Sequence, residues 1–206
     1  MRVKSVYTVK NIVYTMPIAF DIEALRQEHQ CSIYIETGLW DPRDNVSSKQ
    51  ALAANFDRVY CVEIRQDWVD LGRAIFANEI ATQRYHLICD DSTNLKAHID
   101  NIPLLKTERA MFFLDAHVDN SAIKNYKKQC PLIDELLAVQ SLPRNDHVIL
   151  IDDLRILKQP HPWNEHSYGK ISFIEMIRQV LLKINPGYKF KLLNGIVPND
   201  VLCAYV

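Results

Sequence analysis

Carboxylates stand at the ends of five short apolar segments of this 206-residue sequence. The acidic residues are Glu36, Glu63, Asp90 with Asp91, Asp115, and Asp152 with Asp153. A single acidic residue in such a place often caps the helix that follows, because a helix N-terminus favours negative charge. The repetition at five successive segments favours a binding site, since the carboxyl ends of parallel strands converge on one crevice.

Asp115, Asp152 and Asp153 form the most chemically specific group. Two neighbouring strand ends can bring three carboxylates within reach of one hard cation, and oxygen ligands suit Mg²⁺, Ca²⁺ or Mn²⁺. The alternative is that Asp152 and Asp153 only cap the loop after their strand. His117 is a candidate catalytic base with Asp115, because an imidazole titrates near neutral pH; a loop histidine without such a role is the alternative.

The first three strand ends suit a nucleotide-like ligand. Gly38, in the turn IETGLW after Glu36, allows the backbone to approach a ligand closely. Glu63 ends the next strand, where a carboxylate can accept hydrogen bonds from the two hydroxyls of a ribose. Asp91 and Ser92 follow the third strand, where they can contact an adenine edge, cap the next helix, or do both.

The elements that must position these residues alternate between short strands and longer helices. Apolar runs typical of buried parallel strands occupy residues 32–36, 58–63, 86–90, 110–115 and 147–152. Helical patterns lie between them at 47–55, 66–79, 92–100 and 124–141, and another at 17–30 precedes the first strand. This alternation predicts an α/β fold with a doubly wound, mostly parallel sheet.

The pattern changes after the fifth strand. A polar loop leads to an amphipathic helix over residues 171–184, and two closely spaced strands at 188–193 and 201–206 favour an antiparallel pair. We therefore expect an N-terminal extension with a helix over residues 1–30, followed by one Rossmann-like domain over residues 31–206.

Composition narrows the classes of function. The chain has 24 Lys and Arg against 25 Asp and Glu, spread along its length, which argues against a nucleic-acid binder. No apolar run approaches the roughly 18 residues of a membrane span. Five cysteines without a C-x-x-C pair indicate reduced thiols and a cytoplasmic protein: Cys31, Cys61, Cys89, Cys130 and Cys203. Motifs for zinc proteases, serine hydrolases, P-loop enzymes and nicotinamide dehydrogenases are missing.

The motif order IETG, VYCVEI, CDDS, MFFLDAH and VILIDD, closed by PNDVLCAYV, resembles the class I S-adenosylmethionine-dependent methyltransferases. The resemblance implies a Rossmann-like sheet of about seven strands with helices on both faces and only the last strand antiparallel. It also implies that Glu36 and Gly38 approach the methionine part of S-adenosylmethionine, Glu63 the ribose, and Asp91 with Ser92 the adenine.

The aspartates of strands four and five are similar to the metal site of catechol O-methyltransferase-like and macrolide-sugar O-methyltransferase enzymes. That similarity implies a metal, such as Mg²⁺, at Asp115, Asp152 and Asp153, and an acceptor with neighbouring hydroxyls. Two positions differ from the family pattern. Pro42 stands where a second glycine is usual, so the cofactor loop must take another shape, and Asp90 stands where a glycine is common.

From the sequence we expect a methyltransferase that transfers a methyl group to a hydroxylated small molecule or sugar, with S-adenosylmethionine as cofactor and a divalent cation as helper. The alternative is a methyltransferase-fold protein without transfer activity that serves as a nucleotide- or sugar-binding module or an assembly partner. We expect neither a nucleic-acid nor a membrane partner, and a homo-oligomer is left open.

Overall fold

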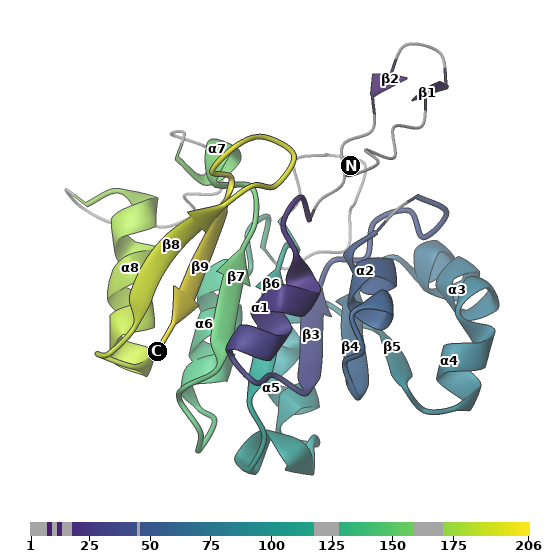
Figure 1. Cartoon of the computed structure of the whole chain (residues 1–206), viewed down its shortest axis with the longest axis horizontal. Coiled ribbons are helices and arrows are strands. Elements are labelled where there is room, and N and C mark those ends of the chain that lie inside the picture. The colour runs from purple at the N-terminus through teal and green to yellow at the C-terminus, as the bar shows by residue number, and fades with distance from the viewer. Residues whose placement is uncertain (1–7, 10–11, 14–17, 45, 118–127, 159–170) are drawn as a thin grey trace.

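A computed structural model describes residues 8–9, 12–13, 18–44, 46–117, 128–158 and 171–206. Its centre is a seven-stranded sheet in the order β5-β4-β3-β6-β7-β9-β8 (Figure 1). The strands are β3 (Ile33–Thr37), β4 (Arg58–Glu63), β5 (Tyr85–Cys89), β6 (Ala110–Leu114), β7 (Val148–Ile151), β8 (Lys189–Leu193) and β9 (Val201–Tyr205). A separate antiparallel pair, β1 (Thr8–Val9) and β2 (Ile12–Val13), lies near the N-terminus.

Only the last strand of the large sheet runs against the others. β3 to β7 pair in parallel, and β9 pairs antiparallel with both β7 and β8. This confirms the predicted doubly wound, mostly parallel sheet with an antiparallel final strand. The chain moves outward from β3 through β4 to β5 and then returns to β6, so strand order reverses between β3 and β6. In such sheets ligands bind outside the carboxyl ends at this reversal.

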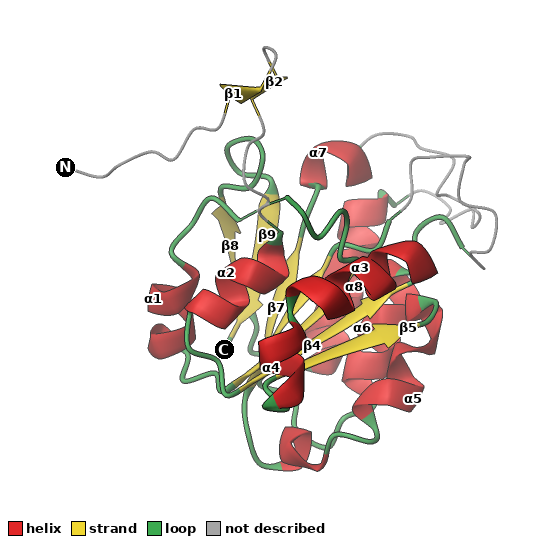
Figure 2. Ribbon diagram, turned by 90° about the vertical axis from the view of Figure 1, so that its right-hand side faces the viewer, coloured by secondary structure: helices red, strands yellow, loops and turns green. Residues whose placement is uncertain are grey.

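Helices cover both faces of the sheet (Figure 2). Apolar side chains of α5 (Leu95–Ile99), α6 (Leu132–Gln140) and α8 (Phe173–Ile184) pack on one face with those of alternate strand positions such as Ile35 and Phe112. The opposite face is covered by α1 (Ile22–Glu28), α2 (Ser47–Ala53) and α3 (Gln66–Ile75). Since the strands are enclosed on both sides, their near-continuous apolar sequence is explained.

Short helices complete the described part of the chain. They are α4 (Ala77–Ala81), α7 (Leu154–Leu157) and two 3-10 helices, η1 (Ser92–Asn94) and η2 (Pro103–Lys106). Ile22 and Leu25 of α1 belong to the same apolar core as Tyr34 of β3, so this helix packs onto the sheet. None of the helices in the described ranges is long and apolar enough to cross a membrane.

Two helix predictions need correction. The predicted helix at 124–141 begins only at Leu132 among the described residues, because Pro131 occupies the position just before it and its ring disfavours a helical turn upstream. Residues 124–127 lie outside the described ranges. The predicted helix at 66–79 divides into α3 and α4 at Phe76, whose buried ring packs edge-on against Tyr85.

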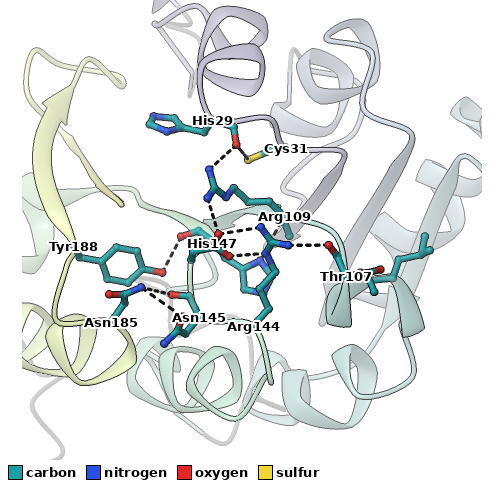
Figure 3. Close-up of polar contacts among 12 residues, drawn as sticks. His29, Cys31, Thr107, Arg109, Arg144, Asn145, His147, Asn185 and Tyr188 are labelled. Carbon is teal, nitrogen blue, oxygen red and sulfur yellow. Dashed lines mark hydrogen bonds and ion pairs between the residues drawn. The ribbon is translucent and has the colours of Figure 1, made fainter.

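The amino ends of the strands carry a polar network in which two arginines share one aspartate (Figure 3). Asp146, just before β7, accepts a hydrogen bond of 2.5 Å from Arg109 and one of 2.9 Å from Arg144. Arg109 also donates to the backbone oxygen of His29 at 3.0 Å, and Arg144 donates to that of Thr107 at 2.7 Å. This edge of the sheet therefore ties the start of β6 to the start of β7.

Candidate active site

Gly38 brings the ends of β3 and β6 together at the strand-order reversal. Its φ is +85°, which side chains rarely allow, and a Cβ atom there would lie 2.6 Å from the backbone oxygen of Asp115. The backbone N–H of Asp115 donates to the oxygen of Thr37 at 3.1 Å. The sequence predicted that this glycine lets the backbone approach a ligand; the close neighbour in the structure is the backbone of Asp115, and the approach to a ligand stays a prediction.

Glu36 is fully buried and faces α2. Its carboxyl group accepts a hydrogen bond of 2.6 Å from the hydroxyl of Ser47 and another from that of Ser48. Burial raises the pKa of Glu36, and the two serines partly oppose this. The Ser48 hydroxyl also lies 2.8 Å from the Tyr85 hydroxyl. Glu36 thus fixes the first turn of α2 behind the loop that carries Gly38.

Glu63 ends β4 beside the same loop and is 3 % exposed. One carboxyl oxygen accepts from the backbone N–H of Leu39 at 2.7 Å, and the other accepts from that of Arg65 at 2.8 Å. Burial raises the pKa of Glu63, while these backbone donors lower it. The carboxylate predicted to bind a ribose therefore holds the backbone of the loops after β3 and β4.

Trp40 follows in this loop and is 65 % exposed. Its φ of +62° is uncommon for a bulky residue, and such conformations cluster at functional sites. The Trp40 ring centroid lies 5.1 Å from that of Trp68 on α3, and the Arg65 guanidinium lies 3.8 Å from the Trp68 centroid. Aromatic and cationic groups therefore stack next to Glu63 at the carboxyl edge.

The acidic residues after β5 stabilise the turn in which they lie. Asp91 accepts from the backbone N–H of Thr93 at 2.9 Å and so caps η1. Asp90 accepts from the Asn94 amide at 2.9 Å and contacts a ring nitrogen of His98 at 2.7 Å. Capping, one of the two uses considered for Asp91, is present in the structure.

Ser92 is buried at the start of η1 and brings a further residue to the site. That residue is Glu135, which is 1 % exposed in the first turn of α6. Burial raises the pKa of its carboxyl group to about 7, and the polar side chains of Ser92 and Thr37 partly oppose this rise. Sequence reasoning missed Glu135, because an acidic residue in the first turn of a helix is ordinary.

Asp115, His117 and Asp153 form one compact group of metal-type ligands, whose nearest ligand atoms all lie within 4.8 Å of one another. The His117 Nε2 atom lies 2.7 Å from an Asp153 carboxyl oxygen and 3.8 Å from one of Asp115. Burial, together with the charges of Asp152 and Asp153, raises the pKa of Asp115 well above its usual range. The carboxylates of this group therefore repel one another, and this repulsion adds to the cost of their burial.

Asp152, Asp153 and Asp200 form a second group of this kind. Asp152 is 1 % exposed, and burial with the neighbouring charge of Asp153 raises its pKa to about 7. Asp200 precedes β9 and accepts a hydrogen bond of 2.8 Å from the backbone N–H of Arg155. The Arg155 guanidinium forms ion pairs with both Asp153 and Asp200. The Arg155 side chain thus already balances part of the negative charge of this second group.

The three predicted metal ligands are divided between these groups, and Asp153 belongs to both. Its φ of +59° is in the left-handed region, which aspartate visits more readily than most residues. Burial raises the pKa of Asp153, but the hydrogen bond from His117 and the charge of Arg155 outweigh it, so the pKa is lowered. Sequence reasoning missed Arg155 and Asp200.

Solved methyltransferase structures share this fold at low sequence identity. TomG, an O-methyltransferase from Streptomyces achromogenes in tomaymycin synthesis, solved with SAM, matches at 15% identity with a TM-score of 0.58, over 90% of this chain and 77% of that chain. An O-methyltransferase from Bacillus cereus, solved with SAH, matches at 16% identity with a TM-score of 0.57, over 90% and 79%. A Clostridium thermocellum protein assigned as an rRNA methylase matches at 14% identity and a TM-score of 0.52, over 89% and 94%.

No protein-family model matches the sequence, and no curated protein matches it. The structural likeness covers nine-tenths of the chain and includes the reversal of strand order at which the acidic residues gather. The chain therefore has the fold of the class I S-adenosylmethionine-dependent O-methyltransferases.

Proposed function

We propose that this protein is an S-adenosylmethionine-dependent O-methyltransferase that acts on a hydroxylated small molecule or sugar. The observation that carries the proposal is Glu63, a buried carboxylate at the end of β4, beside the Gly38 turn where strand order reverses. Two proteins of the same fold, TomG and the Bacillus cereus enzyme, were solved with SAM and SAH. The free cysteines suit a reducing compartment, so we expect the enzyme to act in the cytoplasm.

The residues around Glu63 suit an adenosyl ligand. Each carboxyl oxygen has two acceptor positions, so Glu63 can bind ribose hydroxyls and still keep a backbone N–H of Leu39 or Arg65. The backbone at Gly38 lies at the carboxyl ends of β3 and β6, where the methionine part would extend. When bound, S-adenosylmethionine supplies an electrophilic methyl group for direct transfer to an acceptor oxygen.

The chain's own residues can prepare the acceptor. The Asp153 carboxylate contacts His117 Nε2, an arrangement that fixes the ring of a general base. The imidazole can then hold the proton that leaves an acceptor hydroxyl. A carboxyl oxygen of Asp115 lies 3.8 Å from the same nitrogen.

The acidic group around Asp153 fits a divalent cation. Asp115 and Asp153 offer oxygen ligands beside His117, and the pKa of Asp115 is raised by burial and by the charges of Asp152 and Asp153, which a cation would offset. Asp152 is the other predicted ligand and lies beside Asp153. A cation bound here would lower the pKa of an acceptor hydroxyl.

The test is calorimetric titration of SAH into the wild type and into Glu63→Gln. The glutamine amide keeps only one neutral acceptor oxygen and replaces the other with an NH2 donor, so it loses the paired charged acceptors for the ribose hydroxyls and we expect the Kd to rise by roughly a hundredfold. Glu79→Gln changes a partly exposed glutamate on α4, serves as the matched control and should bind like the wild type. Absence of SAH binding to the wild type would favour a methyltransferase-fold module without transfer activity.

A further inference from the structure

The Asp153 carboxylate, which belongs to both acidic groups at the carboxyl edge, has a partner on each of its oxygens. Oδ2 lies 2.7 Å from Nε2 of His117, and Oδ1 forms an ion pair with the guanidinium of Arg155. The backbone N–H of Asp153 is held as well, because it donates to a carboxyl oxygen of Asp152 at 2.8 Å. A cation that binds Asp153 must therefore share these oxygens with internal partners or displace one of them.

Arg155, on the short helix α7, has a second acidic partner in Asp200. Its backbone N–H donates to one carboxyl oxygen of Asp200 at 2.8 Å, and its Nη1 atom contacts the other oxygen. The same Nη1 atom also contacts Asp153. Asp200 is 1 % exposed, and a carboxylate buried to this degree requires a counter-ion. The guanidinium can thus leave Asp153 and still keep Asp200.

A divalent cation in the group of Asp115, His117 and Asp153 would meet the positive charge of Arg155. The ligand atoms of this group lie within 4.8 Å of one another, and the guanidinium already contacts one oxygen of Asp153. Two cations on one carboxylate repel each other, and the repulsion is stronger in a partly buried site than in water. His117 differs, because a neutral imidazole has a lone pair and can itself be a metal ligand. Arg155 is therefore the partner that a cation has to displace.

We infer that Arg155 is an internal competitor for a divalent cation at Asp153, and that the cation binds when the guanidinium withdraws from Asp153 and keeps its contact with Asp200. The inference rests on the cation site of the proposed function and assigns to it a residue that weakens binding. Without a bound cation, the guanidinium offsets the charge of buried carboxylates that would otherwise repel one another. Arg155 thus stabilises the protein without metal at the expense of cation affinity.

The experiment is calorimetric titration of MnCl₂ into wild type, Arg155→Gln and Arg155→Lys after treatment with EDTA and dialysis. Glutamine removes the positive charge, so Mn²⁺ should bind about tenfold more tightly, or better, than to the wild type. Lysine keeps a cation beside Asp153, so its Kd should lie within about threefold of the wild-type value. Lys158→Gln is the matched control: it removes a positive charge from the exposed end of the same helix and should bind like the wild type.

A crystal structure of the wild type with MnCl₂ needs no variant, so it tests the inference even if Arg155→Gln does not fold. Manganese bound at Asp153, located by its anomalous scattering, should be accompanied by an Arg155 guanidinium that contacts Asp200 and no longer Asp153. Manganese at Asp153 with Arg155 still in contact would overturn the inference. Equal Mn²⁺ affinity in wild type and Arg155→Gln, or binding to Arg155→Lys as tight as to Arg155→Gln, would also overturn it.

Failure of this inference is distinguishable from failure of the proposed function. If Mn²⁺ binds neither the wild type nor Arg155→Gln, the inference and the cation of the proposed function both fall. SAH titrated into the same wild-type sample tests the methyltransferase proposal separately, because SAH is expected at Glu63 and not at Asp153.

Discussion

The two edges of the sheet differ in how far cationic groups compensate their acidic residues. At the amino edge, burial works against the charge of Asp146, but Arg144 and Arg109 outweigh it and lower its pKa. At the carboxyl edge, burial and neighbouring carboxylates raise the pKa of Asp115 and Asp152. Glu135 shares this environment, since burial raises its pKa as well.

This difference separates residues that stabilise the fold from residues that cost stability. An aspartate between two arginines contributes to folding, whereas carboxylates that repel one another oppose it. Proteins tolerate such costs mainly at functional sites. The contrast supports the proposal that the carboxyl edge binds a ligand, and it predicts opposite effects when an acidic side chain is neutralised at each edge.

The largest effect is expected from Asp146→Asn. Both arginines would lose a charged partner in a half-buried setting, so the free energy of unfolding should fall by about 3 kcal/mol. Urea unfolding near pH 7 measures the change. The pKa of Asp146 is lowered in the folded state. Its contribution to stability is therefore present above the pKa of the unfolded state and is lost as the pH falls through the pKa of the folded state. If the free energy of unfolding of Asp146→Asn equals that of the wild type, the amino edge does not stabilise the fold through this residue.

A smaller effect of opposite sign is expected from Glu135→Gln. The pKa of Glu135 is raised from 4.5 to about 7, so the wild type loses stability as the pH rises through this range. At about pH 8 the variant should be more stable by about 2 kcal/mol, and near pH 5 the two should be similar. Thermal unfolding across this range, with Asp134→Asn as control, measures it. A parallel pH profile in both proteins would contradict the prediction.

The smallest effect is expected from Asp152→Asn. Without divalent cations, relief of repulsion with Asp153 should raise the free energy of unfolding by about 1 kcal/mol. Added MgCl₂ or MnCl₂ should stabilise the wild type more than the variant. Urea unfolding with EDTA and then with either salt measures both. Asp200→Asn is the contrasting variant. It removes one of the two acidic partners of Arg155 and should therefore destabilise the protein in EDTA. Equal stabilisation by the salts in wild type and Asp152→Asn would argue against a cation here.

Most of the fold follows from local sequence patterns. The five parallel strands were predicted to within one or two residues, because buried strands have continuous apolar runs and end where acidic residues begin. The helix predicted at 171–184 agrees with α8, whose Ser172 accepts from the backbone N–H of Glu175 at 3.2 Å. Patterns were less informative where one helix pattern covers two elements, as at Phe76, or spans a proline, as at Pro131.

The candidate site was predicted only in part, for a geometric reason. Residues that follow parallel strands reach the carboxyl edge, and a search along strand ends finds them, as it found Asp115 and Asp153. Asp200 precedes β9, which runs in the opposite direction, so the residue before that strand reaches the same edge. Glu135 and Arg155 come from helices, and only the packed structure brings them to the strand ends.

The two tilted indole rings beside Glu63 also have a spectroscopic consequence. Two indole rings with centroids 5.1 Å apart couple their electronic transitions, so Trp40 and Trp68 give a near-ultraviolet circular dichroism signal that depends on their relative orientation. The backbone of the Trp40 loop is hydrogen-bonded to Glu63, so we expect a ligand bound at Glu63 to change this signal. Titration followed by circular dichroism would then report occupancy of the site without any added label.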